Sequence, residues 1–215
     1  MGHKKIKFAV AAVAMVIGVA ALREAAIAQS DADFRRAAFE SSKESVKTGN
    51  YADAVDALQP LAEADDALAQ YSLGVLYAHG GKDLPQDYAK ALSWFRKAAE
   101  KRDAASMREL AIVYEKGLGV AADPAASVQW YDKASNRGDA FAQLMLGEKY
   151  AAGQAVPKDN LQAYKWLTLA SSGVFYDDEE ARRTRTKKDR TTLAAQMSAA
   201  EVSQGEKLVL SFSAQ

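Results

Sequence analysis

Three tryptophans divide the middle of the chain into units of equal length. Trp94, Trp130 and Trp166 are separated from one another by 36 residues. A leucine, a tyrosine, two aspartates and an alanine of each unit recur with the same spacing, to within one residue. The one extra residue falls in the loop Ala78–Asp87 of the first unit. A period of this length requires similar units that stack on one another, because a single unit cannot bury its own apolar face.

Each unit is predicted to contain two helices joined by a glycine loop. In the first unit we expect one helix from Asp66 to about Ala78 and a second from Asp87 to about Lys101. An aspartate before a helix can accept hydrogen bonds from the free N–H groups of the first turn. A glycine suits the helix end. The recurring aspartates are therefore interpreted as helix caps and the recurring tryptophans as packing residues.

The three clear units occupy residues 66–173, and a weaker copy of the unit precedes them at 29–65. The first helix of this copy is expected from about Asp31 to Thr48. Pro60 is predicted to kink or end its second helix, because proline lacks the N–H group that a helix interior needs. Terminal units of a repeat array are often atypical, since they cap it.

The period is lost in the C-terminal segment, residues 174–215. Acidic residues at 177–180 precede the basic run 182–190, an order that suits the dipole of one helix. Ser198 and Glu201 have the spacing of a capping box in front of a final helix to about residue 210. We therefore predict two helices that cover the end of the array.

The first 28 residues have the layout of a signal peptide. A basic start is followed by the apolar run Phe8–Leu22, and then by Ala26 and Ala28 in a small-x-small pattern. An uncleaved membrane anchor is the alternative, but the run is shorter than the roughly 20 residues that a spanning helix needs. We predict cleavage after Ala28, no stable membrane anchor afterwards, and a periplasmic or secreted protein.

Composition narrows the chemistry of the remaining chain. Of 28 basic and 28 acidic residues, four bases and one acid belong to the leader, so 24 bases and 27 acids remain. This balance does not support nucleic-acid binding. Cysteine is absent, and His79 is the only histidine outside the leader. We therefore expect no metal, no cofactor and no catalytic residue. His79 is interpreted as a solvated loop residue, with a pH-sensitive contact as the alternative.

In each unit, a Leu-Gly or Leu-Ala pair, a tyrosine, a glycine loop, an aspartate and a tryptophan follow in the same order. These units resemble the Sel-one-like repeat family, which is related to tetratricopeptide repeats. The match covers about residues 66–173, and more loosely 31–65; Ala111 and Ser127 depart from it conservatively. The resemblance implies an all-α fold, a right-handed α/α superhelical solenoid that acts as an adaptor or scaffold. Exported bacterial relatives often serve envelope regulation, polysaccharide export or host interaction.

Alignment with tetratricopeptide repeats also assigns side chains of the first helix of each unit to a concave surface. We predict that this surface binds an unidentified protein partner in the cell envelope. The alternative is that the C-terminal helices fold into the groove. The candidate binding residues are Leu68, Tyr71, Val75, His79, Arg108, Ile112, Glu115, Phe141, Leu144 and Glu148.

Two alternative functions are an envelope hydrolase and a binder of an anionic envelope glycan. An envelope hydrolase would have to use paired carboxylates, but the acids at 177–180 are interpreted as a solvated helix start and the other aspartates as caps. The basic run 182–190 could bind an anionic envelope glycan, but a solvated, salt-bridged helix face is the stronger explanation. A non-catalytic interaction module is therefore the favoured prediction.

Overall fold

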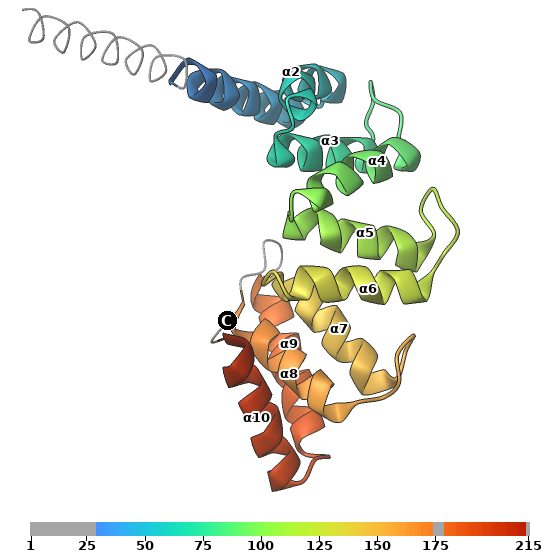
Figure 1. Cartoon of the computed structure of the whole chain (residues 1–215). Coiled ribbons are helices and arrows are strands. Elements are labelled where there is room, and N and C mark those ends of the chain that lie inside the picture. Colours follow the sequence, from blue (N-terminus) through green and yellow to red (C-terminus); the bar gives the residue numbers. More distant parts are fainter. Residues whose placement is uncertain (1–28, 174–178, 214–215) are drawn as a thin grey trace, which may run out of the picture.

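The computed structural model describes residues 29–173 and 179–213, and every regular element among them is a helix. Residues 29–48 are helical and lead into a stack of helices that follows the order of the chain (Figure 1). The labelled helices are α2 (Tyr51–Glu63), α3 (Ala67–His79), α4 (Tyr88–Glu100), α5 (Ala104–Lys116), α6 (Pro124–Ser135), α7 (Ala140–Ala152), α8 (Asn160–Ser172), α9 (Glu179–Ala194) and α10 (Ala199–Ser213).

The three central units are antiparallel helix pairs. Helix α3 packs on α4, α5 on α6, and α7 on α8, while α4 meets α5 and α6 meets α7 to join successive pairs. Helices α9 and α10 both pack on α8 and so cover the end of the array. The predicted all-α solenoid of helix pairs is confirmed, with the two C-terminal helices where they were expected.

Aspartates begin all six helices of the central units. In each case a carboxylate oxygen accepts a hydrogen bond from a backbone N–H group of the first turn, as Asp66 Oδ1 does from Ala69 N at 2.9 Å. Gly117 and Gly153 end α5 and α7 in the left-handed conformation, each with φ 69°. The predicted caps are confirmed: they are Asp66, Asp87, Asp103, Asp123, Asp139 and Asp159.

The repeated apolar residues form the contacts between the helices. A Cβ atom on Gly74 would lie 2.4 Å from the ring of Phe95, so only glycine allows α3 and α4 to approach this closely. Trp94 and Trp166 are buried, as predicted for packing residues. Trp130 is only half-buried, with Lys133 Nζ 3.8 Å from its ring centroid. Trp130 therefore belongs only in part to the core.

Pro60 does not end the second helix, which was one of the two predicted outcomes. The proline lies inside α2, and the helix continues for another turn to Glu63. Leu58, Leu61 and Ala62 around it are buried in one apolar cluster with residues of α3. Burial of these side chains stabilises the last turn against the loss of one backbone hydrogen bond at the proline.

The predicted signal peptide, residues 1–28, lies outside the described residues. Among the helices that the structure does describe, none combines the length and the hydropathy that crossing a membrane requires.

Candidate protein-binding groove

A groove with a volume of about 580 Å³ runs between the helical segment 29–48 and α3, with α2 at its base. Tyr71, Val75 and His79 line the α3 wall, and Phe39 and Val46 line the opposite wall. We call this cavity the α3 groove. Three of the ten predicted binding residues therefore lie together.

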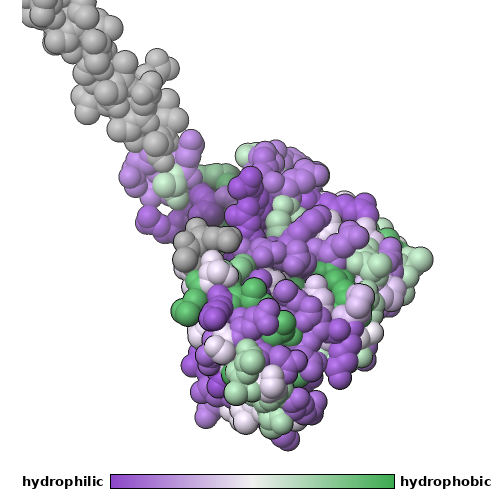
Figure 2. Space-filling view, turned by 60° about the horizontal axis from the view of Figure 1, so that its bottom comes forward, coloured by the Kyte–Doolittle hydropathy of each residue, from purple (hydrophilic) through white to green (hydrophobic). Residues whose placement is uncertain are grey.

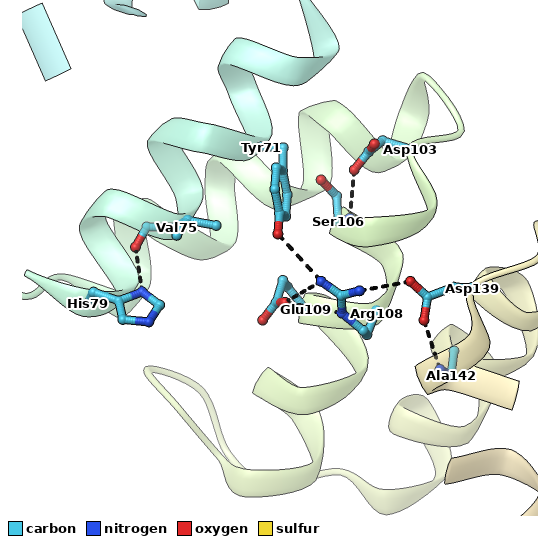
Figure 3. A network of polar contacts seen from close by, with 9 residues as sticks. All are labelled: Tyr71, Val75, His79, Asp103, Ser106, Arg108, Glu109, Asp139 and Ala142. Carbon is cyan, nitrogen blue, oxygen red and sulfur yellow. Dashed lines mark hydrogen bonds and ion pairs between the residues drawn. The ribbon is translucent and has the colours of Figure 1, made fainter. Parts of the chain in front are cut away.

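Helical spacing along α3 places these residues. Ala69, Leu73 and Leu76 are buried in the apolar cluster shared with α2. Tyr71, Val75 and His79 follow one another at intervals of four residues, and such residues share one helix face. His79 ends the helix in an exposed position, with Nδ1 3.0 Å from the carbonyl oxygen of Val75 (Figure 3).

The opposite wall is attached to the array at a few points. Ala38 and Ser42 are the buried residues of the described helical segment 29–48. Nearer the start of the segment, Arg35 Nε donates to Asp66 Oδ2 at 2.5 Å, and its guanidinium lies 5.0 Å from the ring of Phe39. With small buried residues in the middle, this helix leaves Val46 exposed and the groove open toward α3.

Arg108, another predicted binding residue, joins all three units (Figure 3). Its guanidinium donates to Asp139 Oδ2 at 2.9 Å, to Glu109 Oε1 at 3.1 Å and to the hydroxyl oxygen of Tyr71 at 3.4 Å. Asp139 Oδ1 meanwhile caps α7 by accepting from Ala142 N at 2.8 Å. Arg108 therefore links α3, α5 and the start of α7.

Burial controls the electrostatics of this network. It raises the pKa of Asp139, and the pairing with Arg108 offsets only part of that effect. Burial also acts to lower the pKa of Arg108, but the carboxylates of Asp139 and Glu109 outweigh it and hold the pKa above its ordinary value. Burial raises the pKa of Tyr71 as well. At neutral pH the arginine is thus a fixed internal cation, engaged by the protein itself.

Ile112 and Glu115, the other predicted residues of the second unit, are also engaged within the fold. Ile112 is half-buried against the main apolar cluster. Glu115 accepts hydrogen bonds from the hydroxyl of Tyr131 at 2.9 Å and from Lys149 Nζ at 2.5 Å, and both donors belong to buried residues. Burial and the nearby Glu115 raise the pKa of Tyr131. Glu115 thus satisfies two buried polar groups.

The third unit is covered by α9. The guanidinium of Arg182 lies 4.8 Å from the ring of Phe141, and Arg185 Nη2 donates to Glu148 Oε1 at 2.6 Å. Leu144 is only 2% exposed and shares an apolar cluster with Leu193 of α9. The expectation that Leu144 lies on an accessible surface is wrong, because α9 packs over that position. The predicted alternative, a C-terminal helix on this face, occurs here, although Glu148 and Arg185 still line a cavity of about 430 Å³ beside α9.

Leu68 lies outside the groove lining, in the first turn of α3, and is 46% exposed. Sequence reasoning missed the wall that faces α3, which includes Phe39 and Val46. Their spacing of seven residues on a predicted helix was the available signal, since it returns to the same helix face after two turns.

The residues behind the two alternative functions are placed differently. Asp177 and Asp178 lie outside the described residues, and Glu180 is exposed. Within the described ranges, no group of acidic and histidine side chains is arranged to hold a metal ion. Lys187 and Lys188 of the basic run are exposed on α9. In the view that brings the C-terminal end forward, apolar surface residues are scattered among hydrophilic ones (Figure 2).

Stacked helix pairs with capped starts, glycine ends and an open groove define an α-helical repeat solenoid. The Sel1 repeat matches residues 67–103, 104–139 and 140–174, just over half of the chain. The chain therefore belongs to the Sel1 repeat family. Members of this family generally act as protein–protein interaction modules and as non-catalytic scaffolds.

Individual relatives agree with this assignment. The chain is 28% identical to c5321, a protective antigen of uropathogenic Escherichia coli with the same repeat fold; the TM-score is 0.64 over 80% of this chain and 39% of the antigen. It is 32% identical to a Sel1 repeat protein from Oxalobacter formigenes, with a TM-score of 0.53 over 61% of this chain and 95% of that one.

A plant protein matches over a shorter stretch. This is HRD3A of Arabidopsis thaliana, a component of an ERAD-associated E3 ubiquitin-protein ligase, which is 39% identical over 62 residues. The match covers 29% of this chain and 9% of HRD3A. The chain thus spans well under half of the E. coli antigen and a small part of HRD3A.

Proposed function

We propose that this protein is a non-catalytic interaction module of the bacterial cell envelope, and that it binds a segment of a partner protein in the α3 groove. The observation that carries the proposal is the open groove itself, in which Tyr71, Val75 and His79 face Phe39 and Val46. Outside the α3 groove, Leu68 is exposed, whereas predicted residues of the second and third units contact other parts of the fold. The α3 groove is the cavity where three of the predicted residues lie together.

The chemistry of the walls supports protein binding. Phe39, Tyr71 and Val75 are half-buried and Val46 is exposed, so the groove holds apolar surface in contact with water. Covering such surface is favourable by about 25 cal/mol per Å² of apolar area. The volume of about 580 Å³ lies within the range of natural binding sites, roughly 300 to 1,000 Å³.

The envelope location rests on the leader. The basic start, the apolar run and the cleavage pattern at Ala28 support export across the inner membrane. The test is fractionation of cells that express the full chain, with mass spectrometry of the purified protein. A periplasmic protein that begins at Gln29 supports the proposal, whereas a cytoplasmic protein that begins at Met1 contradicts it.

The groove is tested by Val75→Asp, which places a charge on the apolar wall. Envelope proteins are crosslinked in cells and captured with the tagged protein. We expect recovery of the specific partner to fall about tenfold or more, because central apolar contacts carry most of the binding energy of an interface.

The matched control is Leu210→Asp, which adds the same charge at a residue that is 70% exposed on α10. Thermal melting monitored by circular dichroism confirms that both variants are folded. Partner recovery that is equal for Val75→Asp, Leu210→Asp and the unchanged protein would contradict binding in the α3 groove.

A further inference from the structure

The charged side chains that line the α3 groove are all basic. Lys43 and Lys47 stand on the wall formed by residues 29–48, and no carboxylate belongs to the lining within the described chain. The opposite wall is nearly uncharged, because α3 contains no acidic residue, no lysine and no arginine, and His79 ends it. The groove is thus apolar with one cationic edge.

Two acidic groups close to this edge, Glu44 and Asp83, are already engaged. Glu44 Oε2 accepts from Lys47 Nζ at 3.1 Å on the exposed side of the same helix. Asp83 approaches the base of the groove, but its oxygens accept from the backbone N–H groups of Tyr51 at 3.0 Å and Ala52 at 3.2 Å. Among the described residues, Lys43 forms no ion pair with an acid, so its charge is available to a partner.

In the third unit, helix α9 covers the positions that correspond to Tyr71 and Val75 of the first unit. There Glu148 stands where the first unit has Val75, and Leu144 where it has Tyr71. Helix α9 places Arg185 on Glu148 and Leu193 in the cluster of Leu144. In the third unit, a helix with basic and apolar side chains, α9, thus packs on a surface with an acidic and an apolar residue.

From this contrast we infer that the α3 groove takes an amphipathic helix of a partner protein, with an apolar stripe on Tyr71 and Val75 and acidic side chains along Lys43 and Lys47. The inference rests on the proposed function and specifies the partner's chemistry. Opposite charges attract across such an edge and select against partners of the wrong sign.

Two segments of the chain itself carry the wrong charge to occupy the groove. The leader begins with Lys4, Lys5 and Lys7, which have the same sign as the groove edge. The exposed helix of a second copy, α9, carries the basic run 182–190 and would also be repelled. Charge complementarity therefore disfavours these two segments and favours an acidic one, which we assign to a different protein.

The experiment is selection of random peptides displayed on phage against the purified protein at low salt. We expect enriched peptides with apolar residues at helical spacing and an excess of Asp and Glu. Titration of a synthetic enriched peptide, followed by fluorescence anisotropy, should show binding that weakens about fivefold or more in Lys43→Glu/Lys47→Glu and also weakens at high salt. The control Lys187→Glu/Lys188→Glu, the same reversal on α9, should leave affinity unchanged.

The outcomes separate the inference from the proposed function. Enriched peptides that are neutral or basic but are lost with Val75→Asp keep the groove and overturn the acidic partner. Failure to enrich any peptide sensitive to Val75→Asp overturns both. A photo-crosslinker placed at position 46 identifies other occupants: adducts with residues 1–28 or with a second copy also overturn the inference, whereas adducts with the acidic peptide support it.

Discussion

The two ends of the repeat array use the same positions of the unit in opposite ways. In the first unit, Tyr71 and Val75 border the open α3 groove. In the third unit, the equivalent residues Leu144 and Glu148 lie under α9, one in an apolar cluster and the other in an ion pair. The unit therefore does not itself specify a binding surface. The same face of the first helix is buried where a neighbouring helix packs on it and lines a groove where the neighbouring helix stands further away.

The middle of the array shows a third use of this face. Arg108 occupies the position of Tyr71 and Leu144, and it bonds to Tyr71 on one side and to Asp139 on the other. A long, charged side chain at this position joins successive units, whereas a leucine is buried by a helix. The contrast between open and closed ends can be tested through stability, from the largest expected effect to the smallest.

The sharpest test removes the same side-chain atoms at both ends. Leu144→Ala should lower the free energy of unfolding by about 3 kcal/mol, because it leaves a cavity beneath α9. Leu68→Ala, at an exposed position of α3, should cost about 0.5 kcal/mol or less. Urea denaturation of both variants measures the difference. Equal losses would break the comparison, because they would mean that the two ends are equally closed.

Ion pairs give the second test. Arg108→Ala should cost about 2 kcal/mol, because it leaves the carboxylate of Asp139 buried without its partner. Arg185→Ala removes a pair in which the arginine is largely exposed, and should cost about 0.5 kcal/mol. The same denaturation experiment applies. A larger loss for Arg185 would show that α9 is held by this pair more than by its apolar contacts.

Close helix contacts give a smaller effect. Gly74→Ala should lower stability by about 1 to 2 kcal/mol, because the added Cβ would lie 2.4 Å from the rigid ring of Phe95. Gly147→Ala should cost about 1 kcal/mol or less, since its Cβ would lie 2.9 Å from Leu167 Cγ and 3.2 Å from Leu167 N, a milder overlap, and the helix preference of alanine, about 1 kcal/mol, offsets part of it. Thermal melting of both variants decides; equal melting temperatures would contradict this account.

The smallest expected effect is a difference in pKa between Asp66 and Asp139, which cap equivalent helices of the first and third units. Burial acts to raise the pKa of Asp66, but hydrogen bonds from Arg35 and from the N–H of Ala69 outweigh it, so the pKa is lowered. Burial raises the pKa of Asp139 despite Arg108. Carboxyl carbon NMR titration should therefore show Asp66 below and Asp139 above the ordinary aspartate value of about 3.9.

These opposite shifts have opposite consequences for stability. The contribution of Asp66 is present above the ordinary pKa of aspartate and is lost as the pH falls toward its lower folded value. Asp139 binds its proton more tightly in the folded state, so its ionisation reduces stability as the pH rises through its folded value. Asp66→Asn should thus destabilise the protein at neutral pH and have little effect in strong acid. An equal effect at both pH values would contradict the assignment.

Much of the fold could be predicted from the sequence because its signals act over short distances. An aspartate caps a helix through N–H groups two or three residues away, and glycine ends a helix at its own position. Asp87 and Gly117 illustrate both effects. The candidate site was predicted less completely: Tyr71, Val75 and His79 share the groove, but Leu144 is buried.

By itself, the sequence determined the repeat period, the helix limits and the face of each first helix that could meet a partner. The tertiary structure decided which part of that face remains open. The reason is that burial depends on residues far away in the chain: Leu193 covers Leu144, whereas Phe39 stands across a groove from Tyr71. A helix cap is a local hydrogen bond, but exposure is a property of the packed neighbours.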